Sequence, residues 1–234
     1  MRNINKNFSY KDIKILYEDN HLIVCIKPEG VLSQEDSSNG PDMLSLLKEY
    51  IKVKYNKPGD VYLGLVHRLD RRVSGVMVFC KTSKAASRIS EQIRNGSFDK
   101  KYICVCSGRI DGSGTLENSL SKTLDNVAIE DEEGKKCKLE YQVINHFNLE
   151  NNQFSVLLIK LYTGRFNQIR KQLSIINHPL INDFKYGYRL PNYGDTLGLR
   201  CVEISFNHPT TKERMTFKVQ DLDSDVSWIK YMEY

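Results

Sequence analysis

Long apolar runs are missing from this 234-residue sequence. No apolar stretch approaches the roughly 20 residues that a membrane-spanning helix needs. The first ten residues are polar and lack the apolar core of a secretory signal. We therefore expect neither membrane insertion nor secretion.

Metal-ligating patterns are also missing. The six cysteines contain no CxxC pair, and the five histidines form no HExxH-like cluster, so we predict no metal site. Most of the cysteines lie inside apolar runs, as Cys25 and Cys80 do. Buried free thiols are the expected state, which favours a reducing cytoplasm.

The composition is that of a soluble globular protein, with 40% hydrophobic and 27% charged residues. The net charge of +5 (34 basic minus 29 acidic residues) is compatible with a polyanionic partner but does not establish one. The length allows one large domain or two small ones. We expect a loose lead-in over 1–12 and one domain over 13–234, with no separate N-terminal domain.

The most distinctive stretch joins two short β-rich runs, 61–66 and 76–80, which we predict to be strands. Between them, Asp70 lies among three arginines: Arg68, Arg71 and Arg72. Guanidinium groups keep such a carboxylate ionised, which suits a nucleophile better than a general acid. The alternative is a surface turn in which the aspartate pairs with an arginine to hold the loop.

The rest of the chain alternates strands and helices. Predicted strands are 13–17, 22–26, 100–110, 154–162, 199–206 and 215–219. Predicted helices are one capped by Asp42 and ending near 53, one from Ser83 as cap to Gly96, one over about 166–177, and a short one at 225–231 anchored by Trp228. Residues 111–135 look least regular, and we expect short strands and a mobile loop there.

The helix at 166–177 has an apolar stripe on one side and polar residues on the other. The stripe contains Phe166, Ile169, Leu173 and Ile176, and the polar face contains Asn167, Arg170, Lys171 and Ser174. The helix opens with basic residues, and its amide end is aimed at whatever lies beside the preceding strand.

Several motifs together resemble the RluA-type pseudouridine synthases. They are, in chain order, the YEDNHLIVCIKPEGVL segment, His67-Arg68-Leu69-Asp70 with Ser74-Gly75, Lys100-Lys101-Tyr102, Gly164-Arg165 to Arg170 with His178-Pro179 and Asp183, and the closing turn around His208-Pro209. The resemblance covers about 13–219, and its matches occur in the family's order.

The resemblance implies an α+β fold, with a bent, largely antiparallel mixed β-sheet, flanking helices and a central catalytic cleft. It implies that Asp70 is the nucleophile, that Tyr102 stacks on the target base and accepts the C5 proton, and that Arg170 pairs with Asp70. Read from the residues alone, Tyr102 could be a core residue and Arg170 a surface charge. The lysine-proline turn at 27–30 is taken as scaffold.

Other residues are implied as substrate contacts. Candidates for phosphate binding are Arg68, Arg71, Arg72 and Arg165, with Arg68 near a flipped base, and Leu173 is a further substrate-binding candidate. The implied reaction converts a specific uridine in structured RNA to pseudouridine after base flipping, with no cofactor. Ribosomal RNA is slightly favoured over transfer RNA.

Five positions depart from the family pattern: Arg72, Phe166, Asn167, Lys171 and Gln172. They bear on RNA recognition more than on the chemistry. Two other functions remain open from the sequence. One is a non-catalytic RNA-binding protein on the same fold. The other is an unrelated hydrolase with an aspartate nucleophile, which would need a metal or a water-activating base near Asp70.

Overall fold

The computed structural model describes residues 8–149, 151–187 and 196–219. The chain divides into two compact units. Among the described residues, the first unit comprises 8–99 and Cys201–Val219, and the second lies within Lys100–Arg200. The elements form an α+β fold of largely antiparallel strands with helices, as predicted. The bend of the sheet and a central cleft stay predictions.

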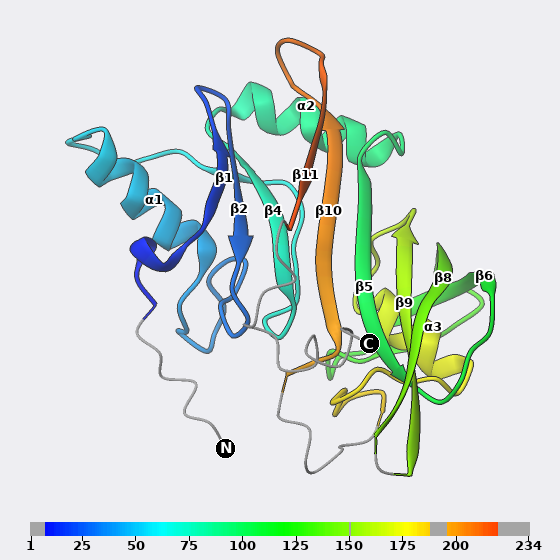
Figure 1. Ribbon diagram of the computed structural model, residues 1–234. Coiled ribbons are helices and arrows are strands. Elements are labelled where there is room, and N and C mark those ends of the chain that lie inside the picture. The colour runs from blue at the N-terminus through cyan, green and yellow to red at the C-terminus, as the bar shows by residue number, and fades with distance from the viewer. Residues whose placement is uncertain (1–7, 150, 188–195, 220–234) are drawn as a thin grey trace. The chain divides into compact units, whose positions relative to one another are not determined.

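The first unit contains strands β1, β2, β4 and β10 side by side, with β11 against β10 and β3 against β4. Figure 1 shows β10 and β11 in orange and red next to β4. The elements in chain order are η1 (Tyr10–Asp12), β1 (Ile15–Glu18), β2 (Leu22–Lys27), α1 (Met43–Lys54), β3 (Gly64–Leu65), β4 (Ser74–Cys80), α2 (Ser83–Arg94), most of β10 (Leu199–Asn207) and β11 (Arg214–Lys218).

The core of the first unit is built on β2 and β4, which pair antiparallel from Leu22 opposite Cys80 to Lys27 opposite Gly75. Every residue of β4 is buried. Strands that are covered on both faces are continuously apolar rather than alternating. For this reason β2 and β4 could both be predicted from the sequence. The strand expected at 61–66 shrinks to β3, because only Gly64 and Leu65 find partners on β4.

The helix caps follow side-chain chemistry. Asp42 caps α1 as predicted, and its carboxylate accepts from the Ser45 N–H at 3.0 Å. The cap of α2 is Thr82 rather than the predicted Ser83, because the Thr82 hydroxyl accepts from the Ala85 N–H at 3.1 Å. Gly96 follows that helix with the expected positive φ of 77°.

The second unit has the strand order β5, β9, β8, β6, β7, and every registered pair within it is antiparallel. Its helix α3 packs against β6 and β7. The elements are most of β5 (Asp99–Ser107), β6 (Ser113–Lys122), β7 (Ala128–Glu130), β8 (Lys135–Leu149), β9 (Asn152–Leu161) and α3 (Gln168–Ile175).

The segment expected to be least regular is mostly strand. β6 is ten residues long and pairs with β8 from Ser113 to Leu120. Its outward positions are small or polar, and Leu116 and Leu120 are its only large apolar residues, so periodicity gave little signal. Strands were expected here, but β6 is longer than predicted because non-local pairing with the long strand β8 organises this stretch.

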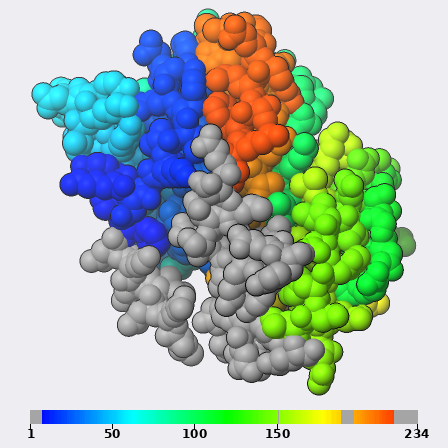
Figure 2. All heavy atoms as spheres, viewed as in Figure 1, coloured from blue at the N-terminus to red at the C-terminus, as the bar shows by residue number. Residues whose placement is uncertain are grey.

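The helix predicted at 225–231 lies outside the described residues, as does most of the lead-in. Among the helices that the structure describes, none is long and apolar enough to cross a membrane. Figure 2 shows β11 in red-orange on the surface of the first unit, and β8 and β9 in yellow-green on that of the second.

Candidate active site

The Asp70 carboxylate lies on a short turn between β3 and β4. Its Oδ1 atom accepts a hydrogen bond from the Arg72 N–H at 2.9 Å, and its carbonyl oxygen accepts from the Val73 N–H at 3.0 Å. The side chain is partly exposed. The carboxylate is therefore held by its own turn while remaining accessible.

The residue before Asp70 is anchored from another segment. Ser33 donates from its hydroxyl to the Leu69 carbonyl oxygen at 2.8 Å and accepts from the Leu69 N–H at 3.1 Å. Ser33 and Leu69 are both buried. This two-way hydrogen bond fixes the backbone on the N-terminal side of Asp70.

The residue after Asp70 is anchored by the lysine-proline turn. The Gly30 N–H donates to the Arg71 carbonyl oxygen at 2.8 Å, and the Arg71 Nε donates back to the Gly30 carbonyl oxygen at 3.0 Å. Gly30 has a φ of +85°, a conformation that favours glycine. The Arg71 side chain thus takes part in holding the turn, and a phosphate contact by Arg71 stays a prediction.

Lys27, at the end of β2, is fully buried. Its Nζ donates to three backbone carbonyl oxygens, of Val31 at 2.6 Å, Pro28 at 2.9 Å and Arg71 at 3.2 Å. Burial lowers the pKa of Lys27 to about 7, and the Asp70 carboxylate counteracts part of that shift. The sequence marked this segment only as scaffold, so its connection to the Asp70 turn was missed.

The glycine of the Ser-Gly pair that follows the Asp70 turn is Gly75, and its surroundings leave no room for a side chain. Its φ is +136°, and a Cβ at this position would lie 2.2 Å from the Cys201 carbonyl oxygen. A side chain here would therefore collide with the neighbouring β10 backbone. The glycine lets β4 start close beside β10, immediately after the Asp70 turn.

The remaining residues of this stretch differ in exposure. The His67 Nε2 accepts from the Val78 N–H at 3.1 Å, and its ring packs against Phe98 with centroids 5.4 Å apart. His67 thus holds the segment before Asp70 against β4. Arg68 is exposed and Arg72 partly exposed, which leaves both candidates for RNA contact as predictions.

Tyr102 lies on β5 in the second unit and is 6% exposed. Its neighbour Lys101 is partly exposed and points to the opposite face of the sheet, because strand side chains alternate. The role of Tyr102 in base stacking and proton removal stays a prediction.

Arg170 is also buried, which differs from the expected polar helix face. Its Nε and Nη2 atoms donate to the two carboxylate oxygens of Asp183, each at 2.7 Å. Its guanidinium lies over the Tyr186 ring at 5.1 Å. A bidentate pair of this kind holds the guanidinium plane in one orientation. A pair between Arg170 and Asp70 stays a prediction.

Asp183 is the supporting residue that the sequence reasoning missed. It has no solvent exposure, and its Oδ1 also accepts from the Lys185 and Tyr186 N–H groups at 3.1 and 3.2 Å. One carboxylate therefore orients both the Arg170 side chain and the 183–186 turn. The feature of the sequence that could have identified Asp183 was its match to the family motif.

Two unusual polar residues, one within α3 and one just before it, have structural roles. Gln172 is fully buried, donates to the Leu116 carbonyl oxygen at 3.1 Å and to the Asn118 side chain at 2.8 Å, and accepts from Gln168 at 3.0 Å. Asn167 precedes α3 with a φ of +51° and donates to the Tyr186 hydroxyl at 3.1 Å. These departures from the family pattern join α3 to its neighbours.

The last two substrate candidates lie in different environments. Arg165 is exposed, and its Nε donates to the Lys136 carbonyl oxygen at 3.1 Å. Leu173 is completely buried. Leu173 therefore supports α3 from within the core, and its contact with a substrate base stays a prediction.

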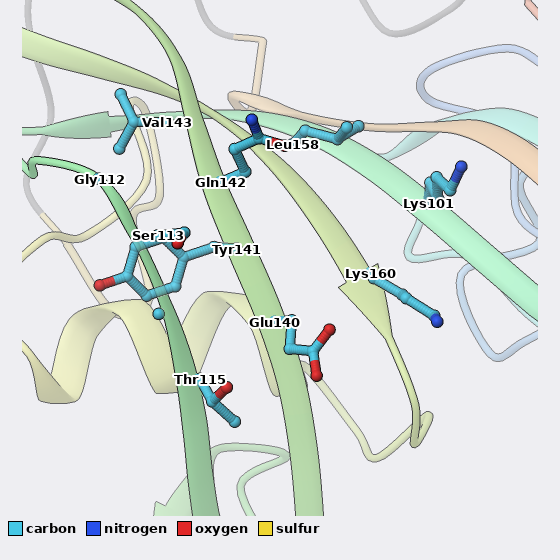
Figure 3. A pocket seen from close by; sticks show the side chains of 11 residues that line it. Lys101, Gly112, Ser113, Thr115, Glu140, Tyr141, Gln142, Val143, Leu158 and Lys160 are labelled. Atoms are coloured by element: carbon cyan, nitrogen blue, oxygen red, sulfur yellow. The ribbon is translucent and has the colours of Figure 1, made fainter.

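A hollow of about 580 Å³ lies elsewhere on the second unit. Figure 3 shows Lys101, Lys160, Glu140 and Thr115 along it, in one cross-strand row. This row includes Lys101, so it occupies the sheet face opposite Tyr102. Within the part of the chain that is described, no three His, Cys, Asp or Glu side chains gather as metal ligands.

Comparison with known proteins identifies the family. The model of the RNA pseudouridylate synthase family matches residues 21–175, which include both Asp70 and Arg170. The chain belongs to this family. The resemblance to RluA-type enzymes, which the sequence motifs carried, is confirmed.

Two relatives illustrate the range of similarity. Ribosomal large subunit pseudouridine synthase C of Buchnera aphidicola is 32% identical over 215 residues, covering 86% of this chain and 64% of that protein. tRNA pseudouridine synthase C of Yersinia pestis is 27% identical over 242 residues, covering 92% of this chain and 91% of that protein. Against three of the curated relatives, this chain spans only 55% to 65% of their length.

A solved structure supports the fold. Human RNA pseudouridylate synthase domain containing 1 superposes with a TM-score of 0.73 at 20% identity, covering 94% of this chain and 89% of that one. At this identity the likeness shows the fold alone.

Proposed function

We propose that this chain is an RNA pseudouridine synthase that isomerises a specific uridine in structured RNA. The observation that carries the proposal is the Asp70 turn, in which an accessible carboxylate is held by its own backbone, while Ser33, Gly30 and Lys27 fix the residues on either side. Rigid support of this kind is what a nucleophile needs to meet one atom of a substrate.

In the proposed reaction, the target uridine leaves the base stack so that Asp70 reaches its sugar. The bond between C1′ and N1 breaks, the uracil rotates, and a bond forms between C1′ and C5. The C5 proton is lost and N1 gains a proton, so the product is an isomer of the substrate. Asp70 either attacks C1′ directly or acts after the base departs with a glycal formed by proton loss.

The second unit supplies the other proposed roles. Tyr102 stacks on the uracil and helps to remove the C5 proton. The proposed role of Arg170, which the family resemblance implies, is to pair with the Asp70 carboxylate, and Asp183 orients its guanidinium. Residues 13–234 are the proposed catalytic domain, and no metal or cofactor is proposed.

RNA is the proposed partner, and the phosphate contacts come from the four arginine candidates: Arg68, Arg71, Arg72 and Arg165. Relatives named for the large ribosomal subunit and for tRNA both align with this chain, and we favour ribosomal RNA slightly. The proposed site of action is the cytoplasm, which the six buried free thiols support.

Tritium release from RNA labelled at uridine C5 tests the function. Wild type and Asp70→Ala are incubated separately with ribosomal and transfer RNA. Release by wild type alone supports a synthase and identifies the RNA class. RNA binding without release from either pool would contradict it and favour the RNA-binding alternative.

A further inference from the structure

Phe166 is an aromatic side chain placed at the surface between two lysines. It lies just before α3 and is 38% exposed. The Nζ of Lys122 lies 4.7 Å from its ring centroid, and the Nζ of Lys185 lies 5.8 Å from it. Nothing in the proposed chemistry uses this cluster.

Three separate segments of the second unit bring these residues together. Lys122 ends β6, Phe166 precedes α3, and Lys185 lies in the turn held by Asp183. Lys185 also donates from its Nζ to the Asn126 carbonyl oxygen at 2.7 Å, in the turn between β6 and β7. The arrangement is therefore tied to the fold at several points.

The surroundings are mostly basic. Arg165, adjacent in sequence, and Lys136, whose carbonyl it contacts, are both exposed. Asp125, in the turn after β6, and Glu130, on β7, are exposed acidic residues in the same part of the second unit. Asp183 adds no exposed negative charge here, because its carboxylate is buried and paired with Arg170.

We propose that Phe166, with Lys122 and Lys185, forms a stacking platform for an unpaired base of the substrate RNA. The proposal rests on the proposed function and extends it to substrate recognition. An aromatic ring offers a face for a base, and neighbouring ammonium groups meet the phosphates on either side, the combination typical of single-strand binding. At exposed sites a lysine over a ring is held weakly, so a base can displace it.

The test is binding of single-stranded oligouridylate, and of the same backbone made abasic, measured by fluorescence anisotropy. Phe166→Leu keeps an apolar side chain but removes the ring, and Phe166→Tyr keeps the ring. We expect Phe166→Leu to weaken binding of oligouridylate by about five-fold or more, with no added loss on the abasic strand. Phe166→Tyr should bind oligouridylate with the wild-type affinity. Val53→Ala, an exposed apolar position on α1, is the control.

The lysines have their own readout. Lys122→Gln with Lys185→Gln should reduce the slope of log affinity against log salt by about 1.4, at about 0.7 for each phosphate contact. Lys52→Gln with Lys57→Gln, both exposed, removes the same charge and should leave the slope unchanged.

Equal binding of oligouridylate by wild type and Phe166→Leu would overturn the platform, as would an equal loss on the abasic strand. Tritium release by wild type is measured independently. Release with no effect of Phe166→Leu on binding refutes the platform alone, whereas the binding effect without release refutes the synthase and leaves the platform standing.

Discussion

The Lys27 ammonium group donates a hydrogen bond to the Arg71 carbonyl oxygen, 3.2 Å away across 44 residues of sequence. This contact connects the lysine-proline turn to the residue directly after Asp70. Burying a lysine costs free energy unless its N–H groups find hydrogen-bond acceptors. Here three backbone carbonyl oxygens accept from Lys27. Lys27 thereby helps to hold the turn that presents the proposed nucleophile.

The first prediction concerns pH. In the unfolded chain Lys27 holds its proton up to its ordinary pKa of 10.5, whereas in the folded protein its pKa is about 7. Between these values the unfolded state binds more protons, so Lys27 makes the free energy of unfolding rise with pH, by at most about 1.4 kcal/mol per pH unit. Conversely, the contribution of Lys27 makes the free energy of unfolding fall as the pH decreases from 10.5 toward 7.

The measurement is urea unfolding of wild type and Lys27→Met at a series of pH values from about 6 to about 8.5. The difference between the two proteins isolates Lys27, because the thiols and other groups titrate in both. Lys48→Met, on the exposed side of α1, controls for a surface lysine. A difference that stays constant across this pH range would contradict the prediction.

The second prediction concerns the pair of Arg170 and Asp183. Asp183→Asn leaves a buried guanidinium without its carboxylate, and we expect a loss of about 3–5 kcal/mol in the free energy of unfolding. Glu117→Gln breaks an exposed pair with Lys138, with the same kind of substitution, and should cost far less, because solvent screens exposed ion pairs. Equal losses in the two variants, measured by urea unfolding, would refute the structural role of Asp183.

The third prediction concerns Gly75. Gly75→Ala places a Cβ 2.2 Å from the Cys201 carbonyl oxygen, at a φ of +136°. We expect failure to fold, or a loss of at least about 3 kcal/mol. At Gly59 an added Cβ meets nothing within 4 Å, so Gly59→Ala is the control. The check is soluble yield and thermal midpoint, and similar midpoints for the two variants would show that β4 tolerates a side chain at its start.

The fourth prediction concerns RNA affinity. If arginines contact phosphates, the affinity falls steeply with salt, and Arg68→Gln reduces the slope by about 0.7 to 0.9. Arg94→Gln, exposed at the end of α2, removes the same charge as a control and should leave the slope as in wild type. An affinity that does not change from low to high salt would argue against phosphate contacts altogether.

Much of the fold was predictable because its central strands are apolar runs. β2, β4 and β9 follow from short stretches of large apolar residues, and α1 follows from its Asp42 cap. β6 was less predictable, since its residues are mostly small or polar and its pairing with β8 and β7 makes it a strand. The α2 cap was misplaced by one residue because Thr82 and Ser83 are both suitable caps.

The candidate site was predictable only as a set of motifs. Periodicity placed Arg170 on a polar face, but its carboxylate partner Asp183 lies 13 residues further on, beyond the helix, and the pair is buried. Likewise, the burial of Lys27 depends on a turn contributed by residues 28–31 and on Arg71, far along the chain. Such long-range contacts leave no periodic trace in the sequence.

The most direct test of the account is the nucleoside content of RNA treated with wild type and with Asp70→Asn. The RNA is digested to nucleosides, and pseudouridine is separated from uridine by chromatography, while binding of the same RNA confirms that the variant is folded. We predict that wild type converts uridine to pseudouridine and that Asp70→Asn binds RNA but is slower by at least about a thousand-fold. Pseudouridine formation by Asp70→Asn at the wild-type rate would contradict the assignment of Asp70 as the nucleophile.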